Sequence, residues 1–340
     1  EQKLATKKWD ITPYVNVYNK TPDNGFSQFK DSPRYSTGYT TLFNTLGMMV
    51  ETHMLKPYKQ RVEGTYELMK SMIEITEKDG LKIKQLRKEA NKNLIAKKTY
   101  ALSWMVDTLK HSTLNFKGYE GQIITSSITG KDRLKYNQQK TFEKPVTYQN
   151  YFKPLNEIKI PKAYIVPKGW HTIIELLKLN NTEMHQLEKD SSFTVERYKI
   201  EDYKSKNTPY EGHYLHYNTS ISSSKGTITF KKGDFLIKTN QPSFRYIIET
   251  LEPQAPDSFF NWNFFDTILK QKEGFSAYVW EDKALEFLNE NPEIKKEFDT
   301  KKETEPNFKA NWYMQLDWIH KQSPNYEASH LRYPIIRVGS

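Results

Sequence analysis

The chain has 340 residues, of which 51 are Lys or Arg and 41 are Asp or Glu, so its formal net charge is +10. It contains no cysteine, which excludes disulfide bonds, thiolate zinc fingers, iron–sulfur clusters and cysteine nucleophiles. No run of about 18 consecutive apolar residues occurs, so the sequence predicts no transmembrane span.

Turn-forming residues dominate the start of the chain around a short extended run at 14–18, which predicts a strand that leads into a long ordered loop. Residues 42–50 form a compact apolar run followed by turn residues, a pattern consistent with a buried strand. Pro57 then begins a predicted helix, because apolar residues recur every three or four positions from there. This helix is expected to end near Asp79 and Gly80.

A dense basic run lies between Lys78 and Lys98, with apolar residues at roughly helical spacing between its charges. This pattern predicts the solvated face of an amphipathic helix, and a phosphate-binding stripe is the alternative. No helix-turn-helix, aromatic RNA-binding signature or zinc knuckle accompanies the run, so we expect no nucleic-acid partner.

The residue pattern of the sequence changes after residue 98. Short β-type segments are separated there by Pro, Gly and Ser clusters, and the predicted strands are 99–105, 146–151, 163–166, 193–200, 227–230 and 235–238. Helices are predicted at 172–179, 264–272, 283–288 and 311–320. The predicted fold class is α/β over residues 1–98, followed by a β-rich unit with a few helices over residues 99–340.

Histidine pairs were weighed as metal ligands because His-x-x-Glu can place two ligands on one face of a helix. The match, His185 with Glu188, lies in a charged stretch without a convincing third ligand, which favours a surface helix. His213 and His216 point to opposite faces if they lie on a strand, so structural or exposed roles are favoured for both. The sequence therefore assigns no metal ligand within this chain.

Glu51 is the strongest candidate for a catalytic group. It stands at the end of the predicted apolar strand, downstream of a Tyr-rich, Gly-containing loop. A carboxylate in such a place is costly unless it is paired or used. It could serve as a general base near a metal-bound water, with a loop Tyr hydrogen-bonded to substrate, or it could pair with Lys56 or Arg34.

The same residues resemble the closing part of the zinc carboxypeptidase family, the carboxypeptidase-A-like or funnelin group. The similarity runs from residues 9–17 through Ser32-Pro33-Arg34-Tyr35-Ser36-Thr37-Gly38-Tyr39 to Val50-Glu51-Thr52-His53 and Pro57. The resemblance implies that Glu51 is the general base or acid and that the helix from Pro57 is the last of the catalytic domain. It also implies that Tyr35 contacts the substrate, with Tyr39 as the alternative.

Segments 164–167, 211–213, 233–235 and 251–258 resemble the region that larger bacterial members of this family append. The resemblance thus implies that residues 1–98 close a carboxypeptidase-like catalytic domain and that residues 99–340 are the appended region. It implies hydrolysis of C-terminal residues from peptides by an exported, periplasmic or cell-surface bacterial enzyme.

The family's zinc ligands precede the loop Tyr in chain order, whereas the first histidine of this chain is His53. The resemblance therefore implies that zinc is bound by an upstream segment of a longer parent protein, or that the chain is a relic without chemistry. The start at Glu1 favours a processed or truncated chain, which alone is expected to be inactive. Its expected partners are the peptide substrate and the upstream catalytic segment.

A non-catalytic binding or assembly module of an exported or cell-surface protein is the alternative, with a cell-envelope component as its possible partner. The aromatic run 259–265 could stack on a ligand, although core packing is the favoured use. An enzyme segment should present Glu51 toward a missing half of its cleft, whereas a binding module should present a cleft or aromatic patch on the β-rich unit.

Overall fold

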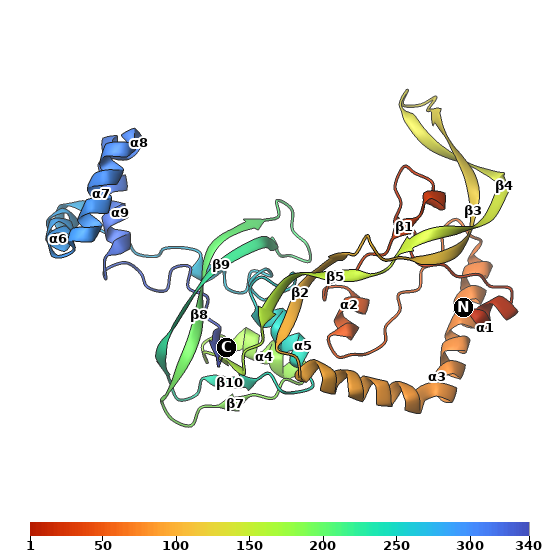
Figure 1. The fold of residues 1–340 in the computed structure, drawn as a ribbon, viewed down its shortest axis with the longest axis horizontal. Coiled ribbons are helices and arrows are strands. Elements are labelled where there is room, and N and C mark those ends of the chain that lie inside the picture. Colours follow the sequence, from red (N-terminus) through yellow and green to blue (C-terminus); the bar gives the residue numbers. More distant parts are fainter. Residues whose placement is uncertain (340) are drawn as a thin grey trace.

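The computed structural model describes residues 1–339 and has an elongated, open shape (Figure 1). A long helix lies along one side, a β-hairpin projects from the top, and a group of helices extends at the opposite end. The chain is α/β: its first 98 residues are mainly helical and the region that follows is β-rich with helices toward its end.

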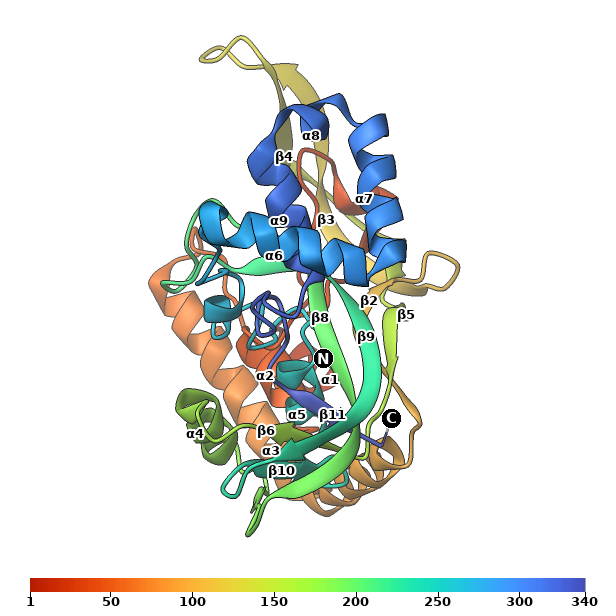
Figure 2. The same ribbon diagram turned by 90° about the vertical axis from the view of Figure 1, so that its left-hand side faces the viewer.

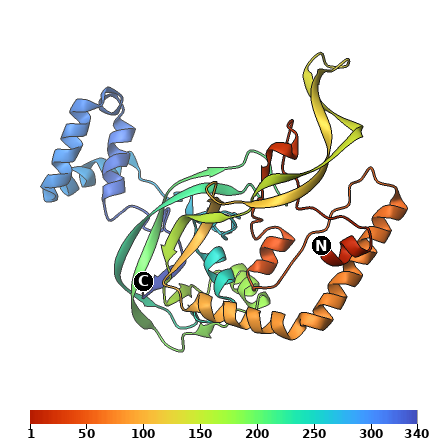
Figure 3. The same ribbon diagram turned by 45° about the vertical axis from the view of Figure 1, so that its right-hand side comes forward.

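The N-terminal region is built around one long helix. Its elements are α1 (Gln2–Thr6), the 3-10 helix η1 (Pro22–Asn24), β1 (Phe26–Ser27), α2 (Ser36–Thr41) and α3 (Tyr58–Ile95). Helix α3 continues through the predicted break at Gly80, so the two predicted helices are one, and it bends along its length (Figures 1 and 3). An isolated glycine costs a helix only about 1 kcal/mol, which its neighbours offset.

Two strand predictions in this region are wrong. Residues 14–18 have no regular structure, and residues 42–50 form a turn followed by an extended segment without strand pairing. Only Leu42 of the second run is buried, while residues 46–50 are exposed. An apolar run becomes a strand only when a neighbouring strand accepts its backbone hydrogen bonds, and residues 1–339 provide none at this place.

Two antiparallel strand pairs follow α3, and the second of them is a hairpin inserted between the strands of the first. Strand β2 (Thr99–Val106) pairs with β5 (Phe152–Lys159), and β3 (Ser112–Thr125) pairs with β4 (Asp132–Gln149), to which the short β1 adds in parallel. The predicted strand at 99–105 is confirmed, and that at 146–151 falls on the end of β4. The long β3–β4 hairpin projects from the body, as Figure 3 also shows.

The main body is a six-stranded sheet in the order β7-β10-β6-β11-β8-β9. Its strands are β6 (Ala163–Val166), β7 (His185–Gln186), β8 (Ser191–Ser205), β9 (His216–Phe230), β10 (Phe235–Lys238) and β11 (Ile336–Val338). Helices α4 (His171–Leu179) and α5 (Phe244–Leu251) lie near β6, β10 and β11 (Figure 2). The strand predictions at 163–166, 193–200, 227–230 and 235–238 and the helix at 172–179 are confirmed.

The largest hydrophobic core joins the two predicted regions. It contains apolar residues of β6, α4 and α5 together with the loop aromatics Phe259, Phe260 and Phe265. Leu42, from the N-terminal region, is 1% exposed within this core, and Phe43 packs against it. The segment around α2 is therefore anchored in the β-rich unit.

One buried ion-pair network holds the last strand in the sheet. Arg337 of β11 lies with its Nε 3.1 Å from Glu252 Oε1, and it also pairs with Glu196 of β8. Tyr164 donates a hydrogen bond of 2.5 Å to Glu252 Oε1. Burial raises the pKa of the Glu252 carboxyl, whereas Arg337 opposes that shift. Side-chain exposure is only 5% for Arg337 and 1% for Glu252, so each charge depends on the other for compensation.

The projecting helical unit consists of α6 (Ala277–Glu290), α7 (Pro292–Thr304), α8 (Pro306–Ala310) and α9 (Trp312–Gln322), and it has a small core of its own. The predicted helices at 283–288 and 311–320 lie within or overlap α6 and α9. The predicted helix at 264–272 is wrong, since only the 3-10 helix η2 (Asp266–Ile268) forms there. That segment instead turns to bury Phe265 and Ile268 in the main core.

We expect His320 to make the stability of this helical unit dependent on pH. Its ring is 3% exposed and packs against Trp280, Phe275 and Tyr326, and burial lowers its pKa. In the unfolded chain His320 therefore takes up a proton near pH 6.5, whereas the folded chain resists that protonation. The contribution of neutral His320 to stability is complete above this pH and is lost as the pH falls. We expect the urea midpoint to fall between pH 7.5 and pH 5, and to fall less in His320→Gln.

Urea unfolding followed by circular dichroism at the two pH values would measure this difference. Exposed His185→Gln is the matched control. An equal pH dependence in wild type and His320→Gln would contradict the assignment to His320.

Candidate functional site

Glu51 lies in an extended segment between α2 and α3 that belongs to neither a helix nor a strand. Its side chain is exposed, and among residues 1–339 it forms no hydrogen bond or ion pair. The predicted alternative, a salt bridge to Lys56 or Arg34, is therefore wrong: Arg34 pairs with Asp257 instead.

Solvent-exposed apolar side chains flank Glu51 in the sequence of this segment. They are Leu46, Met48, Met49, Val50, Met54 and Leu55. Helix α3 begins directly after the segment and carries further exposed apolar side chains: Tyr58, Val62, Tyr66, Met69, Met72 and Ile73. Folded domains seldom leave so long a succession of apolar side chains in water. We call the segment 46–55 and the first half of α3 the open apolar face.

Tyr35 and Tyr39 lie at the start of α2 and within it. Tyr35 is the N-cap residue of α2, and its side chain is 48% exposed. The Tyr39 hydroxyl donates a 2.6 Å hydrogen bond to Asn180 Oδ1, so that hydroxyl is already used within the fold. Of the two candidates for substrate contact, this arrangement favours Tyr35.

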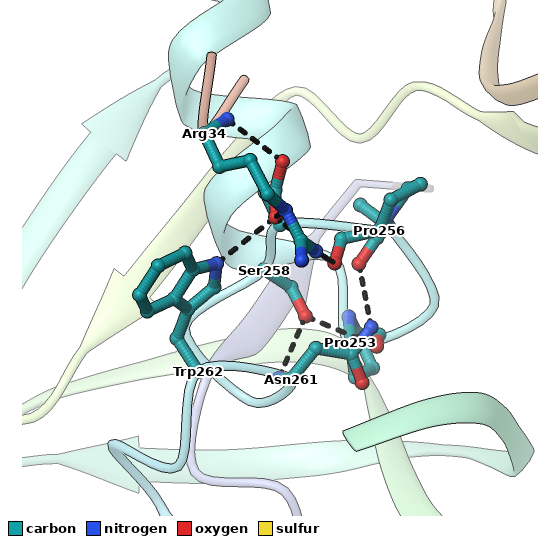
Figure 4. Close-up of polar contacts among 8 residues, drawn as sticks. Arg34, Pro253, Pro256, Ser258, Asn261 and Trp262 are labelled. Carbon is teal, nitrogen blue, oxygen red and sulfur yellow. Dashed lines mark hydrogen bonds and ion pairs between the residues drawn. The ribbon is translucent and has the colours of Figure 1, made fainter. Parts of the chain in front are cut away.

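Arg34, the residue before Tyr35, is held by the β-rich unit (Figure 4). Its Nε and its backbone N–H donate to the two carboxylate oxygens of Asp257 at 2.8 and 2.9 Å. Trp262 Nε1 donates to the same carboxylate at 3.0 Å. The Arg34 guanidinium also lies 5.6 Å from the ring centroid of Tyr210 and 5.7 Å from that of Trp262. These charge-assisted contacts make Arg34 and Asp257 one unit.

No pattern in the sequence singles out Asp257 or Asn180. The bonds to Arg34 and Tyr39 span 223 and 141 positions in the chain. The one signal available was that Asp257 falls within the segment 251–258 that resembles the appended region.

The histidines considered as metal ligands are not brought together. His185 is exposed on the edge strand β7, not on the predicted surface helix, and Glu188 follows it in an exposed loop. His213 packs against Trp262. Among residues 1–339, no group of three His, Asp or Glu side chains could hold a metal ion.

His216 is buried and has partners on both ring nitrogens. Ser205 Oγ lies 2.8 Å from Nδ1, and Asp266 Oδ1 lies 2.9 Å from Nε2. Ser205 is the residue opposite His216 in the β8–β9 ladder, so strand pairing itself accounts for their contact. The favoured structural role of His216 is to join β8 and β9 to the loop that carries Asp266.

The aromatic run 259–265 serves the core, as the sequence analysis favoured. Phe259, Phe260 and Phe265 are buried, while Trp262 and Phe264 are partly covered. Most of the run is therefore used in core packing.

Comparison with known proteins found no matching family model, no matching curated protein and no matching solved structure. None of the helices formed by residues 1–339 combines the length and the apolar character that a bilayer crossing requires.

Proposed function

We propose that this chain is the C-terminal portion of a zinc metallocarboxypeptidase that removes C-terminal residues from peptides. In this proposal Glu51 is the general base and acid, Tyr35 contacts the substrate, and the zinc ligands belong to an upstream segment of the parent protein. The support from sequence is the family resemblance of residues 9–57.

The observation that carries the proposal is the open apolar face. The run 42–50 has the composition of a buried strand, yet most of it is exposed and lacks strand partners among residues 1–339. Burial of apolar surface is favourable by about 25 cal/mol per Å², so contact with another protein segment that buries this face would be favourable. An upstream segment with a sheet edge would cover it and would bring its own groups to Glu51.

The proposed chemistry of this chain is proton transfer and substrate contact. When bound by the upstream segment, zinc would polarise the scissile carbonyl. Glu51 is free of competing ion pairs within residues 1–339, so its carboxylate can accept a proton from the attacking water and pass it to the leaving amine. Tyr35 can donate a hydrogen bond from its exposed side chain. We place the parent protein outside the bacterial cytoplasm, in the periplasm or at the cell surface, as the resemblance implies.

A non-catalytic binding or assembly role, with a cell-envelope partner, is the second candidate. The exposed aromatic side chains Tyr278, Trp312 and Tyr313 of the projecting helical unit favour it. Aromatic side chains are enriched at protein interfaces, which is why such a group on a projecting unit supports docking.

Assay of the parent protein with peptides would decide between the two candidates. We expect release of C-terminal residues, loss of that release on treatment with a chelator, and recovery on addition of zinc. Mass spectrometry of the peptides measures the product directly. Intact peptides at every zinc concentration, from folded parent protein, would contradict the peptidase proposal and favour the binding role.

A further inference from the structure

The loop that carries Tyr35 is held at several points by residues that follow it by more than a hundred positions. Arg34 is bound to Asp257, and Tyr39 is bound to Asn180. Three residues after Tyr39, Leu42 is buried in the main core. The loop and α2 thus have a defined place on the β-rich unit, although the rest of the segment up to α3 is exposed.

Asp257 is itself prepared for this contact by its own turn (Figure 4). Ser258 Oγ donates to the Pro253 carbonyl at 3.1 Å and accepts from the Asn261 backbone N–H at 3.1 Å. Asn261 Nδ2 donates to the Ala255 carbonyl at 2.7 Å. These bonds lie within a buried turn, so they order the Asp257 carboxylate independently of its contact with Arg34.

The bond between the Asp257 carboxylate and the Arg34 backbone N–H is the informative contact. A side-chain ion pair alone would leave the main chain free to move, whereas this bond restrains the Pro33–Arg34 peptide unit, one residue before Tyr35. The Asp257 side chain is 4% exposed, and a charge-assisted bond is strong where water is excluded.

We propose that Asp257 is a positioning residue for Tyr35: the β-rich unit sets the place of the substrate-binding loop through the Arg34–Asp257 contact. This inference rests on the proposed function in so far as Tyr35 binds substrate. Residues 99–340 then contribute to the proposed active site, because they position its substrate-binding loop. Tyr39 acts with it as an anchor, because its hydroxyl is bonded to Asn180.

Hydrogen exchange of the chain, followed by mass spectrometry, tests the contact without any activity. In Asp257→Asn we expect exchange in peptides covering residues 31–44 to rise by about tenfold, because a charged acceptor becomes a neutral one. Asp190→Asn removes an exposed carboxylate that pairs with Lys231 and is the matched control, expected to leave these peptides unchanged. Unchanged exchange in Asp257→Asn would overturn the proposal.

Arg34→Gln guards against misfolding of the Asp257 variant, because it removes the partly exposed side of the pair and leaves the Asp257–Trp262 bond in place. It also keeps the backbone N–H bond to Asp257, so exchange over residues 31–44 should rise less than in Asp257→Asn. A rise as large as that in Asp257→Asn would overturn the role given to the main-chain bond.

A double-mutant cycle in the parent protein tests whether Asp257 acts through Tyr35. We expect Tyr35→Phe and Asp257→Asn each to lower kcat/KM, mainly through KM, and the double variant to be no worse than Tyr35→Phe alone. Multiplicative losses would show that Asp257 acts elsewhere and would overturn the positioning role. If wild-type parent protein has no peptidase activity, the proposed function and the substrate role of Tyr35 both fall, while the exchange experiment still decides the contact.

Discussion

Replacing Glu51 by Gln is expected to lower kcat of the parent protein by about 10²–10⁴-fold, the usual contribution of a general acid or base. Gln is almost the same size as Glu but cannot accept the proton of the attacking water. Because Glu51 is exposed and forms no hydrogen bond or ion pair within residues 1–339, the substitution should leave the thermal midpoint of this chain unchanged. Loss of activity without loss of stability is the expected signature.

Steady-state kinetics and thermal unfolding of the same preparations measure both quantities. Glu63→Gln is the matched control, since Glu63 lies on α3 with an exposed side chain 3.8 Å from Lys59. It is expected to retain wild-type kcat. Full activity in Glu51→Gln would reject Glu51 as the general base, whatever the parent protein hydrolyses.

Truncation of Arg337 to Ala is expected to destabilise the chain by about 3–5 kcal/mol, the usual cost of breaking a buried ion pair from one side. The substitution leaves the Glu252 carboxyl buried beside Tyr164 without its cation. It also removes the link between β11 and β8 that Arg337 forms with Glu196. The cost arises from the uncompensated charge more than from the lost contact.

Urea unfolding followed by circular dichroism measures this effect. Exposed Arg332→Ala, in the same C-terminal segment, should change the free energy of unfolding by less than about 0.5 kcal/mol. Adding Glu252→Gln to Arg337→Ala should recover part of the loss, because the stranded charge is then removed. A loss below about 1 kcal/mol in Arg337→Ala would contradict a compensated buried pair.

The local sequence pattern predicted secondary structure correctly where the apolar residues of a segment themselves show that it is buried. Strands 163–166 and 235–238 and helix α4 were predicted nearly at their observed bounds, because apolar residues there lie between clear turn residues. The hairpin β3–β4 was largely missed, since its outer part is exposed and polar on both faces, although residues near its base alternate between covered and exposed. Helix α7 was missed for a related reason: it is highly charged and buries only Phe298.

The run 42–50 shows the limit of pattern most directly. Its composition predicts a buried strand, but whether such a run is buried depends on a partner that lies elsewhere. In this chain Leu42 enters the main core while Leu46 and Val50 remain in water. The composition of the run and its exposure disagree, and that disagreement supports an upstream partner.

Composition and spacing were enough to predict that the chain is α/β and lacks cysteine chemistry, and the resemblance proposed Glu51 and Tyr35 as candidates. These features depend on neighbours close in the chain or on the residues themselves. The choice of Tyr35 over Tyr39, the Arg34–Asp257 contact and the Arg337–Glu252 pair came only from the folded chain. Each joins positions more than 80 residues apart, and no local pattern encodes which distant side chain will lie within hydrogen-bonding distance.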